Sequence, residues 1–156
     1  MSRDVRYIEV PAESVPLRER EAAAGAVSWA ALDLGMPAPA IRWFTDCPTT
    51  AGEAWTGLTN AMTPPPPADS FDIDRRIRGY VSPQDPGTVW IHVGMGRVQA
   101  ALTALHEACH TFQATLMGTA RGRLEFDGRE AQARAYADDL REIARAIATT
   151  EGNRDA

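Results

Sequence analysis

The sequence predicts a single α+β domain, in which a small antiparallel or mixed sheet packs on helices. Several short segments are rich in β-branched and aromatic residues and are bounded by turn-forming residues, as strands are. Other, longer segments carry apolar residues at steps of three and four, as amphipathic helices do. The chain has 156 residues, close to the roughly 150 residues of one domain. We therefore expect residues 1–156 to form one domain.

The N-terminal part predicts a strand, a helix and a second strand. Val5–Val10 is rich in strand-forming residues. Leu17–Leu34 is rich in alanine and is predicted to be a helix, because Pro16 suits a first helical turn and Gly35 ends the pattern. Ile41–Thr45 is again typical of a strand.

The middle of the chain predicts a loop followed by a hairpin. Glu53–Leu58 is a weaker strand candidate, and Asn60–Ser70 holds four consecutive prolines, which favour an extended surface loop. Asp72–Val81 alternates apolar and polar residues, as a half-buried strand does. Because Ser82–Gly87 is rich in turn residues, Thr88–Val93 is expected to return antiparallel to the preceding strand.

The C-terminal part predicts two helices. Arg97–Met117 has an amphipathic pattern, and Arg129–Thr149 is expected to form the final helix, with a frayed tail at 151–156. Three glycines mark the predicted loop between the helices: Gly118, Gly122 and Gly128.

Composition limits the classes of partner. Sixteen basic and 21 acidic residues give a net charge of −5, which argues against a nucleic-acid binder that neutralises phosphates. No apolar run has the length of a signal peptide core or a membrane span. The two cysteines, Cys47 and Cys109, do not make a disulfide framework. We expect a cytoplasmic protein with no nucleic-acid or membrane partner, and its oligomeric state stays open.

The second predicted helix contains His106-Glu107-Ala108-Cys109-His110, a match to the H-E-x-x-H motif. Two histidines four residues apart lie on one face of a helix, so both can bind one zinc ion. The pair flanks the apolar stripe, whereas Cys109 falls within the stripe and is expected to be a core residue. Glu107 is the predicted general base.

A catalytic zinc usually has three protein ligands, so a third must come from elsewhere. The H-E-x-x-H-x-x-G-x-x-H pattern is absent, because Gln113 and Leu116 occupy its last two positions. The candidates are His92, Glu125, Asp127 and Glu130. We favour Glu130, because it lies on a helix that can pack against the motif. The competing interpretation makes Asp127 an N-cap and Glu130 its capping-box partner.

From about Thr88 to Leu140 the chain resembles the gluzincin metallopeptidases, and among them the small ImmA/IrrE-like peptidases. The residues that carry the resemblance are the H-E-x-x-H helix and Glu130, Ala133, Tyr136 and Ala137, which fit an E-x-x-A-x-x-[FY]-A signature. Arg134 stands where asparagine is usual in that signature. The resemblance implies a minimal zincin-like fold, with a sheet packed on the motif helix, a following helix and an N-terminal helix. It also implies that Glu130 supplies the third ligand.

We therefore expect a zinc metallopeptidase that hydrolyses a peptide or protein bond. Tyr136 is a candidate catalytic residue that could stabilise the oxyanion, as could His92 or an arginine. If Thr88–Val93 lies at the edge of the sheet, an extended substrate could pair with it as an added strand; the alternative is that this strand is interior or covered. One alternative is a catalytically silent zinc-binding regulatory or interaction module. Another is a hydrolase of a non-peptide amide.

Overall fold

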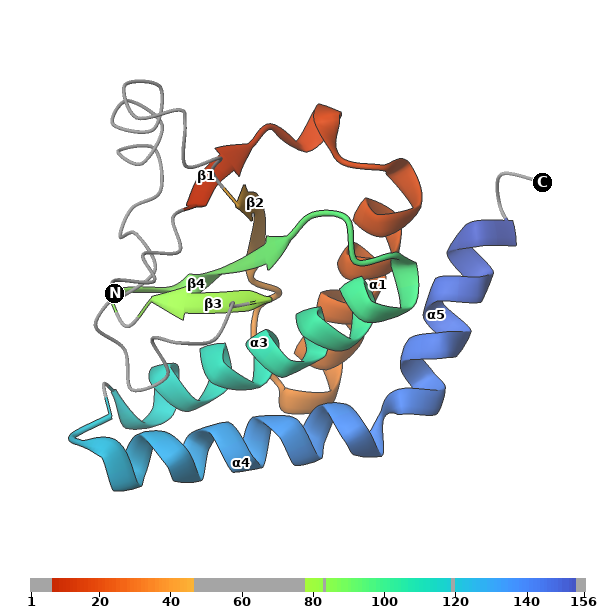
Figure 1. Ribbon diagram of the computed structural model, residues 1–156. Helices are drawn as coiled ribbons and strands as arrows, with labels where there is room; N and C mark the ends of the chain where they lie inside the picture. Colours follow the sequence, from red (N-terminus) through yellow and green to blue (C-terminus); the bar gives the residue numbers. More distant parts are fainter. Residues whose placement is uncertain (1–6, 47–77, 83, 119, 154–156) are drawn as a thin grey trace.

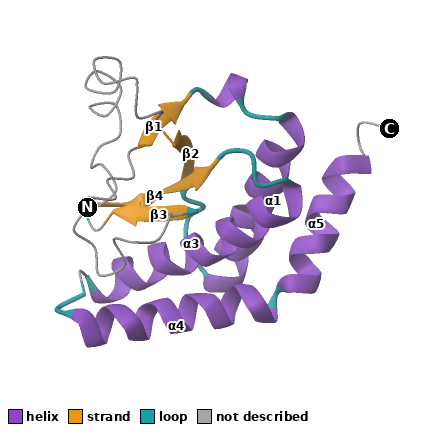
Figure 2. Ribbon diagram, in the orientation of Figure 1, coloured by secondary structure: helices purple, strands orange, loops and turns teal. Residues whose placement is uncertain are grey.

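A computed structural model describes residues 7–46, 78–82, 84–118 and 120–153 of the chain. Within these residues, a four-stranded mixed sheet packs on helices, so the predicted α+β class is confirmed (Figures 1 and 2). The helices α1 and α3 contact each other, and α3 also contacts α4, α5 and the strands β3 and β4. The motif helix α3 is thus the central element of the described fold.

The first elements follow the sequence pattern closely. The helix α1 spans Leu17–Leu34, as predicted, and it ends at Gly35, whose φ of 65° is left-handed and favours glycine. The strand before α1 falls within the predicted range, and the strand after α1 is longer than predicted by one residue at each end. Their bounds, with that of a short 3-10 helix, are β1 Tyr7–Val10, η1 Ala12–Ser14 and β2 Ala40–Asp46.

The predicted hairpin is also confirmed. The strands β3, Gly79–Ser82, and β4, Asp85–His92, pair antiparallel. The connecting turn is shorter than predicted, because β4 begins at Asp85, inside the expected turn. The predicted strand Glu53–Leu58, the predicted loop Asn60–Ser70 and the start of the predicted strand Asp72–Val81 lie outside the described residues.

The order of the strands decides between the two positions considered for Thr88–Val93. The sheet runs β1-β2-β4-β3, with β2 parallel to β4 and the other two pairs antiparallel. The strand β4 is therefore an inner strand, and neighbouring strands use both its edges. It is not available to pair with an extended substrate, so the alternative of an interior strand holds for Thr88–Val93.

The helix that follows α3 begins earlier than predicted. The helix α3 spans Arg97–Met117, as predicted, but α4 begins at Arg123 and runs to Asp139. Gly128 is consequently a helical residue and not part of a loop. Asp127 lies inside α4, so the competing capping-box interpretation is wrong; the N-cap is Gly122.

The predicted final helix is in fact two helices. The backbone breaks at Leu140, after which α5 runs from Arg141 to Asn153. Figure 1 shows that α5 turns away from the axis of α4, and it contacts α1 and α3. The turn allows the buried Ala144 and Ala148 to join the main core. Part of the predicted frayed tail, residues 151–153, is therefore helical.

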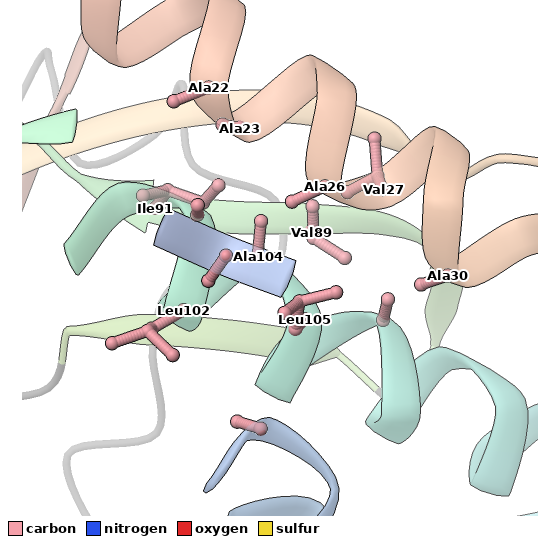
Figure 3. Close-up of a cluster of buried hydrophobic side chains, with 14 of the residues drawn as sticks. Ala22, Ala23, Ala26, Val27, Ala30, Val89, Ile91, Leu102, Ala104 and Leu105 are labelled. Atoms are coloured by element: carbon pink, nitrogen blue, oxygen red, sulfur yellow. The ribbon is translucent and has the colours of Figure 1, made fainter. Parts of the chain in front are cut away.

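The main core lies between α1, α3 and the inner face of the sheet (Figure 3). Much of it is alanine, whose small side chain lets α1 and α3 approach closely. Leu105 is fully buried here, and Cys109 is buried as predicted, while Cys47 lies outside the described residues. Side chains of this core that Figure 3 labels are Ala22, Ala23, Ala26, Val27, Ala30, Val89, Ile91, Leu102, Ala104 and Leu105.

None of the helices in the described part of the chain has the length and apolar character needed to cross a membrane.

Candidate metal centre

Two neighbouring helices bring together the residues predicted to bind zinc. His106 and His110 project from the middle of α3, one turn apart, and Glu130 projects from α4, which runs beside α3 (Figure 1). Arg129 helps to hold the two helices together. Its guanidinium donates to the backbone carbonyl of Gly118 at the end of α3, at 2.5 Å, and pairs with Glu125 at 2.8 Å. Such carbonyls have no partner within their own helix.

The donor atoms of the three side chains converge on one point. The Nε2 atoms of His106 and His110 lie 3.2 Å apart. The Glu130 carboxylate places Oε1 2.6 Å from His110 Nε2 and Oε2 3.5 Å from His106 Nε2. These ligand atoms all lie within 4.8 Å of one another, and the three side chains are half-buried. Among the described residues, this is the one group of three or more metal-binding side chains that is so closely placed.

The separation of the two histidine nitrogens fits a tetrahedral metal ion, whereas Glu130 Oε1, 2.6 Å from His110 Nε2, is at hydrogen-bond distance and would move back when both bind the metal. Two Zn–N bonds of about 2.0–2.1 Å that meet at a tetrahedral angle hold their nitrogens about 3.3 Å apart. The observed separation of 3.2 Å between the two Nε2 atoms is close to this value. Two histidines and one carboxylate also form a donor set that catalytic zinc sites use, with a fourth position left for water or substrate. The residues present therefore fit the metal that the sequence predicts.

Glu107 lies beside this group but is more deeply buried. The residue is 6% exposed, and its Oε2 is 4.0 Å from His106 Nε2. The first residue of β3, Gly79, lies directly against it. A Cβ atom at Gly79 would be 2.6 Å from Glu107 Cγ and 2.7 Å from Thr103 Cγ2, so only glycine leaves room for both side chains. The edge of the sheet thus confines the predicted base.

The charges at the site are strongly coupled. Burial raises the pKa of Glu107, although both histidines oppose the rise. Burial would lower the pKa of His110, but the hydrogen bond to Glu130 and the charge of Glu107 outweigh it and raise this pKa to about 9. The opposite holds for Glu130, whose pKa is lowered because hydrogen bonds from His106 and His110 outweigh burial. Without a metal, a protonated His110 therefore pairs with an ionised Glu130.

The other three candidates for the third ligand lie elsewhere. His92 Nε2 is 2.9 Å from Asp46 Oδ1, and its Nδ1 is 2.7 Å from the Val93 carbonyl oxygen. Glu125 pairs with Arg129, as described above. Asp127 pairs with Arg123 across one turn of α4, at 3.6 Å. Of the four candidates, the structure brings only Glu130 to the histidine pair.

The structure directs the hydroxyl of Tyr136 away from a role at the metal. This hydroxyl donates to Asp33 Oδ2 on α1, at 3.0 Å. Burial and the bond to Asp33 both raise the pKa of Tyr136. The tyrosine also packs against the main core. Its contacts are those of a residue that joins α4 to α1, and the predicted oxyanion role has no support from them.

Sequence reasoning missed two residues that contact the site. Gln113 is 1% exposed, and its Oε1 is 2.7 Å from His110 Nδ1. At 100° per residue, Gln113 falls between the edge of the apolar stripe of α3 and His106, and a polar residue beside the histidine pair on that face is the signal that could have revealed it. Gly79 was recognised only as part of a strand. No local signal connects it with Glu107, because the contact joins distant segments.

No protein-family model, curated protein sequence or solved structure matches this chain.

Proposed function

We propose that this chain is a zinc-dependent metallopeptidase of the gluzincin type, which hydrolyses a peptide or protein bond. In this proposal His106, His110 and Glu130 bind the metal and Glu107 is the general base. One observation carries it: both His Nε2 atoms and the Glu130 carboxylate converge between α3 and α4, beside a buried Glu107. The cytoplasmic location expected from the sequence belongs to the same proposal.

Each residue has a distinct task. Zinc, when bound, supplies Lewis acidity, which brings the deprotonation of water near to neutral pH and polarises a carbonyl group. Glu107 takes the proton that water loses and passes it to the leaving amine. Burial raises the pKa of Glu107, which makes it a better proton acceptor and donor near neutral pH than an exposed carboxylate.

The position of Glu107 favours an enzyme over a silent zinc-binding module. A structural zinc site needs no base. Burying a carboxylate costs free energy, so a buried carboxylate next to two metal-binding histidines indicates a functional role. The nearby ring nitrogen of His106, at 4.0 Å, offsets only part of that cost. This residue is therefore the most informative one to change.

The test combines zinc content with hydrolysis. We expect about one zinc per chain in the wild type and in Glu107→Gln, and much less in Glu130→Gln. Glu125→Gln is a matched control on the same helix and should keep its zinc, because Glu125 pairs only with Arg129 among the contacts described. A peptide library should be cleaved by the wild type and not by Glu107→Gln.

Three results would contradict the proposal in different ways. A wild type that takes up no zinc even when zinc is supplied would reject the metal site. Cleavage by Glu107→Gln at the wild-type rate would reject the assigned base. Stoichiometric zinc without cleavage of any peptide in the library would favour the interaction module.

A further inference from the structure

Gln113 is a buried amide between the second histidine of the motif and α4. Its side chain reaches three partners. Oε1 faces His110 Nδ1 at 2.7 Å, while Nε2 donates to the Arg129 carbonyl at 3.0 Å and to Gln132 Oε1 at 2.7 Å. Because the side chain is 1% exposed, water does not compete for these bonds.

These contacts determine which way the amide points. A backbone carbonyl oxygen can only accept a hydrogen bond, so the NH₂ group of Gln113 must face Arg129. The amide oxygen then faces His110, and an amide oxygen can also only accept. His110 must therefore carry a proton on Nδ1. When the ring is neutral, its lone pair is on Nε2, the atom that faces His106 and Glu130.

The same side chain also reaches the third predicted ligand through the backbone. Arg129 immediately precedes Glu130, so the bond from Gln113 to the Arg129 carbonyl holds the turn of α4 that carries Glu130. Gln132, the third partner, lies two residues beyond Glu130 on the same helix. One amide thus connects the ring of His110 to both sides of Glu130 along α4.

We propose that Gln113 is the positioning residue of the metal centre. It selects the His110 tautomer that presents Nε2 to the metal. It also fixes the position of α4 along α3, so that the Glu130 carboxylate lies next to the two histidine rings. This inference rests on the proposed zinc site. It concerns how the ligands are oriented, and Gln113 itself does not touch the metal. Partners of this kind contribute about 10–100-fold to metal affinity when they orient a histidine ligand.

Gln113→Met tests the inference, because methionine has a similar length and shape but no amide. Zinc affinity is measured by competition with a chelator at fixed pH. We expect Gln113→Met to bind zinc about 10–100-fold more weakly than the wild type. Gln113→Glu is the conservative variant: a protonated carboxyl group can donate to the Arg129 carbonyl and still accept from His110. It should restore most of the lost affinity.

A second measurement separates orientation from folding. Nitrogen-15 NMR of the His110 ring in zinc-loaded protein reports which nitrogen binds the metal and which carries the proton. We expect Nδ1–H in the wild type, and in Gln113→Met an Nδ1–H that exchanges faster with solvent because it has lost its acceptor. Leu124→Ala is the control; it shortens an exposed side chain on the same helix as Glu130 and should change neither the Nδ1–H signal nor the affinity.

The outcomes are distinguishable. If the wild type binds zinc and Gln113→Met binds it equally well, the positioning role is overturned while the metal site stands. If the wild type binds no zinc, the proposed function fails and the positioning role fails with it. If Gln113→Met does not fold, the wild-type spectrum decides, because a zinc-loaded protein in which His110 binds through Nδ1 and carries its proton on Nε2 contradicts the inference.

Discussion

Gly79→Ala should disturb the site without touching a proposed metal ligand. The new Cβ would lie 2.6 Å from Glu107 Cγ and 2.7 Å from both Glu107 Oε2 and Thr103 Cγ2. Ordinary contacts between carbon atoms begin at about 3.5 Å, so the side chains or β3 must move by about 0.9 Å to relieve the 2.6 Å contact. Glu107 is buried and has little space to move into. Overpacking of this kind costs about 1–3 kcal/mol of stability.

Urea unfolding of the metal-free proteins measures this cost without knowledge of the substrate. Gly87→Ala is the matched control, because Gly87 lies on β4 and nothing is within 4 Å of its added Cβ. We expect Gly79→Ala to lose about 1–3 kcal/mol and Gly87→Ala to change little. For a peptide cleaved by the wild type, Gly79→Ala should lower the rate about 100-fold, the effect of a misplacement near 1 Å, while zinc content stays normal.

A double-mutant cycle assigns the effect to Glu107. In a Glu107→Ala background the Cγ and Oε2 atoms are gone, so part of the penalty for Gly79→Ala should disappear. Residues in contact typically show interaction energies of about 0.5–3 kcal/mol. The reasoning fails if Gly79→Ala is as stable as Gly87→Ala, or if its penalty is the same with and without the Glu107 side chain.

Two further predictions test other contacts of the site. Tyr136→Phe loses the hydrogen bond to Asp33 and should lower the free energy of unfolding by about 0.5–1.5 kcal/mol. Its zinc content and its rate of peptide cleavage should stay unchanged. A large loss of cleavage would restore the oxyanion role that the structure does not support. The metal-free protein should also depend on pH, because the pKa of His110 is raised from 6.5 to about 9 in the folded state. The stabilisation is complete below pH 6.5 and is lost as the pH rises through about 9, with a fall of up to about 3 kcal/mol. The pKa of Glu130 is lowered, so its own contribution is lost only when the pH falls below its usual range. Urea unfolding over this range, with His110→Gln as control, measures the effect, and an equally steep fall in His110→Gln would assign it to other groups.

Local signals predicted the elements whose ends depend on backbone conformation. The ends of α1 match because Pro16 favours a helix start and Gly35 adopts a left-handed φ. The same reasoning failed at the start of α4, where Asp127 and Gly128 have the composition of a loop and cap. There, contacts such as the Arg129 bond to the end of α3 outweigh the low helix propensity of glycine.

The spacing of the histidines and the position of Glu130 predicted the cluster, because each depends on helical geometry within a short segment. The order of the strands could not be predicted in this way. The parallel pairing of β2 with β4 joins residues such as Ile41 and Val89 that are far apart in sequence. For the same reason, the contact between Gly79 and Glu107 left no local trace.

The two helices of the candidate site are held to different degrees. The helix α3 is buried among the other helices and the sheet, whereas α4 has only Ala133 and Ala137 fully within the protein among its described side chains. Segments with little buried surface open more readily than the core. A metal ion held by both helices would add its binding free energy to the docking of α4, the less firmly held partner. Zinc supply would then determine how long α4 stays packed against α3. It would therefore also determine how well this part of the chain is protected from amide hydrogen exchange and from proteases.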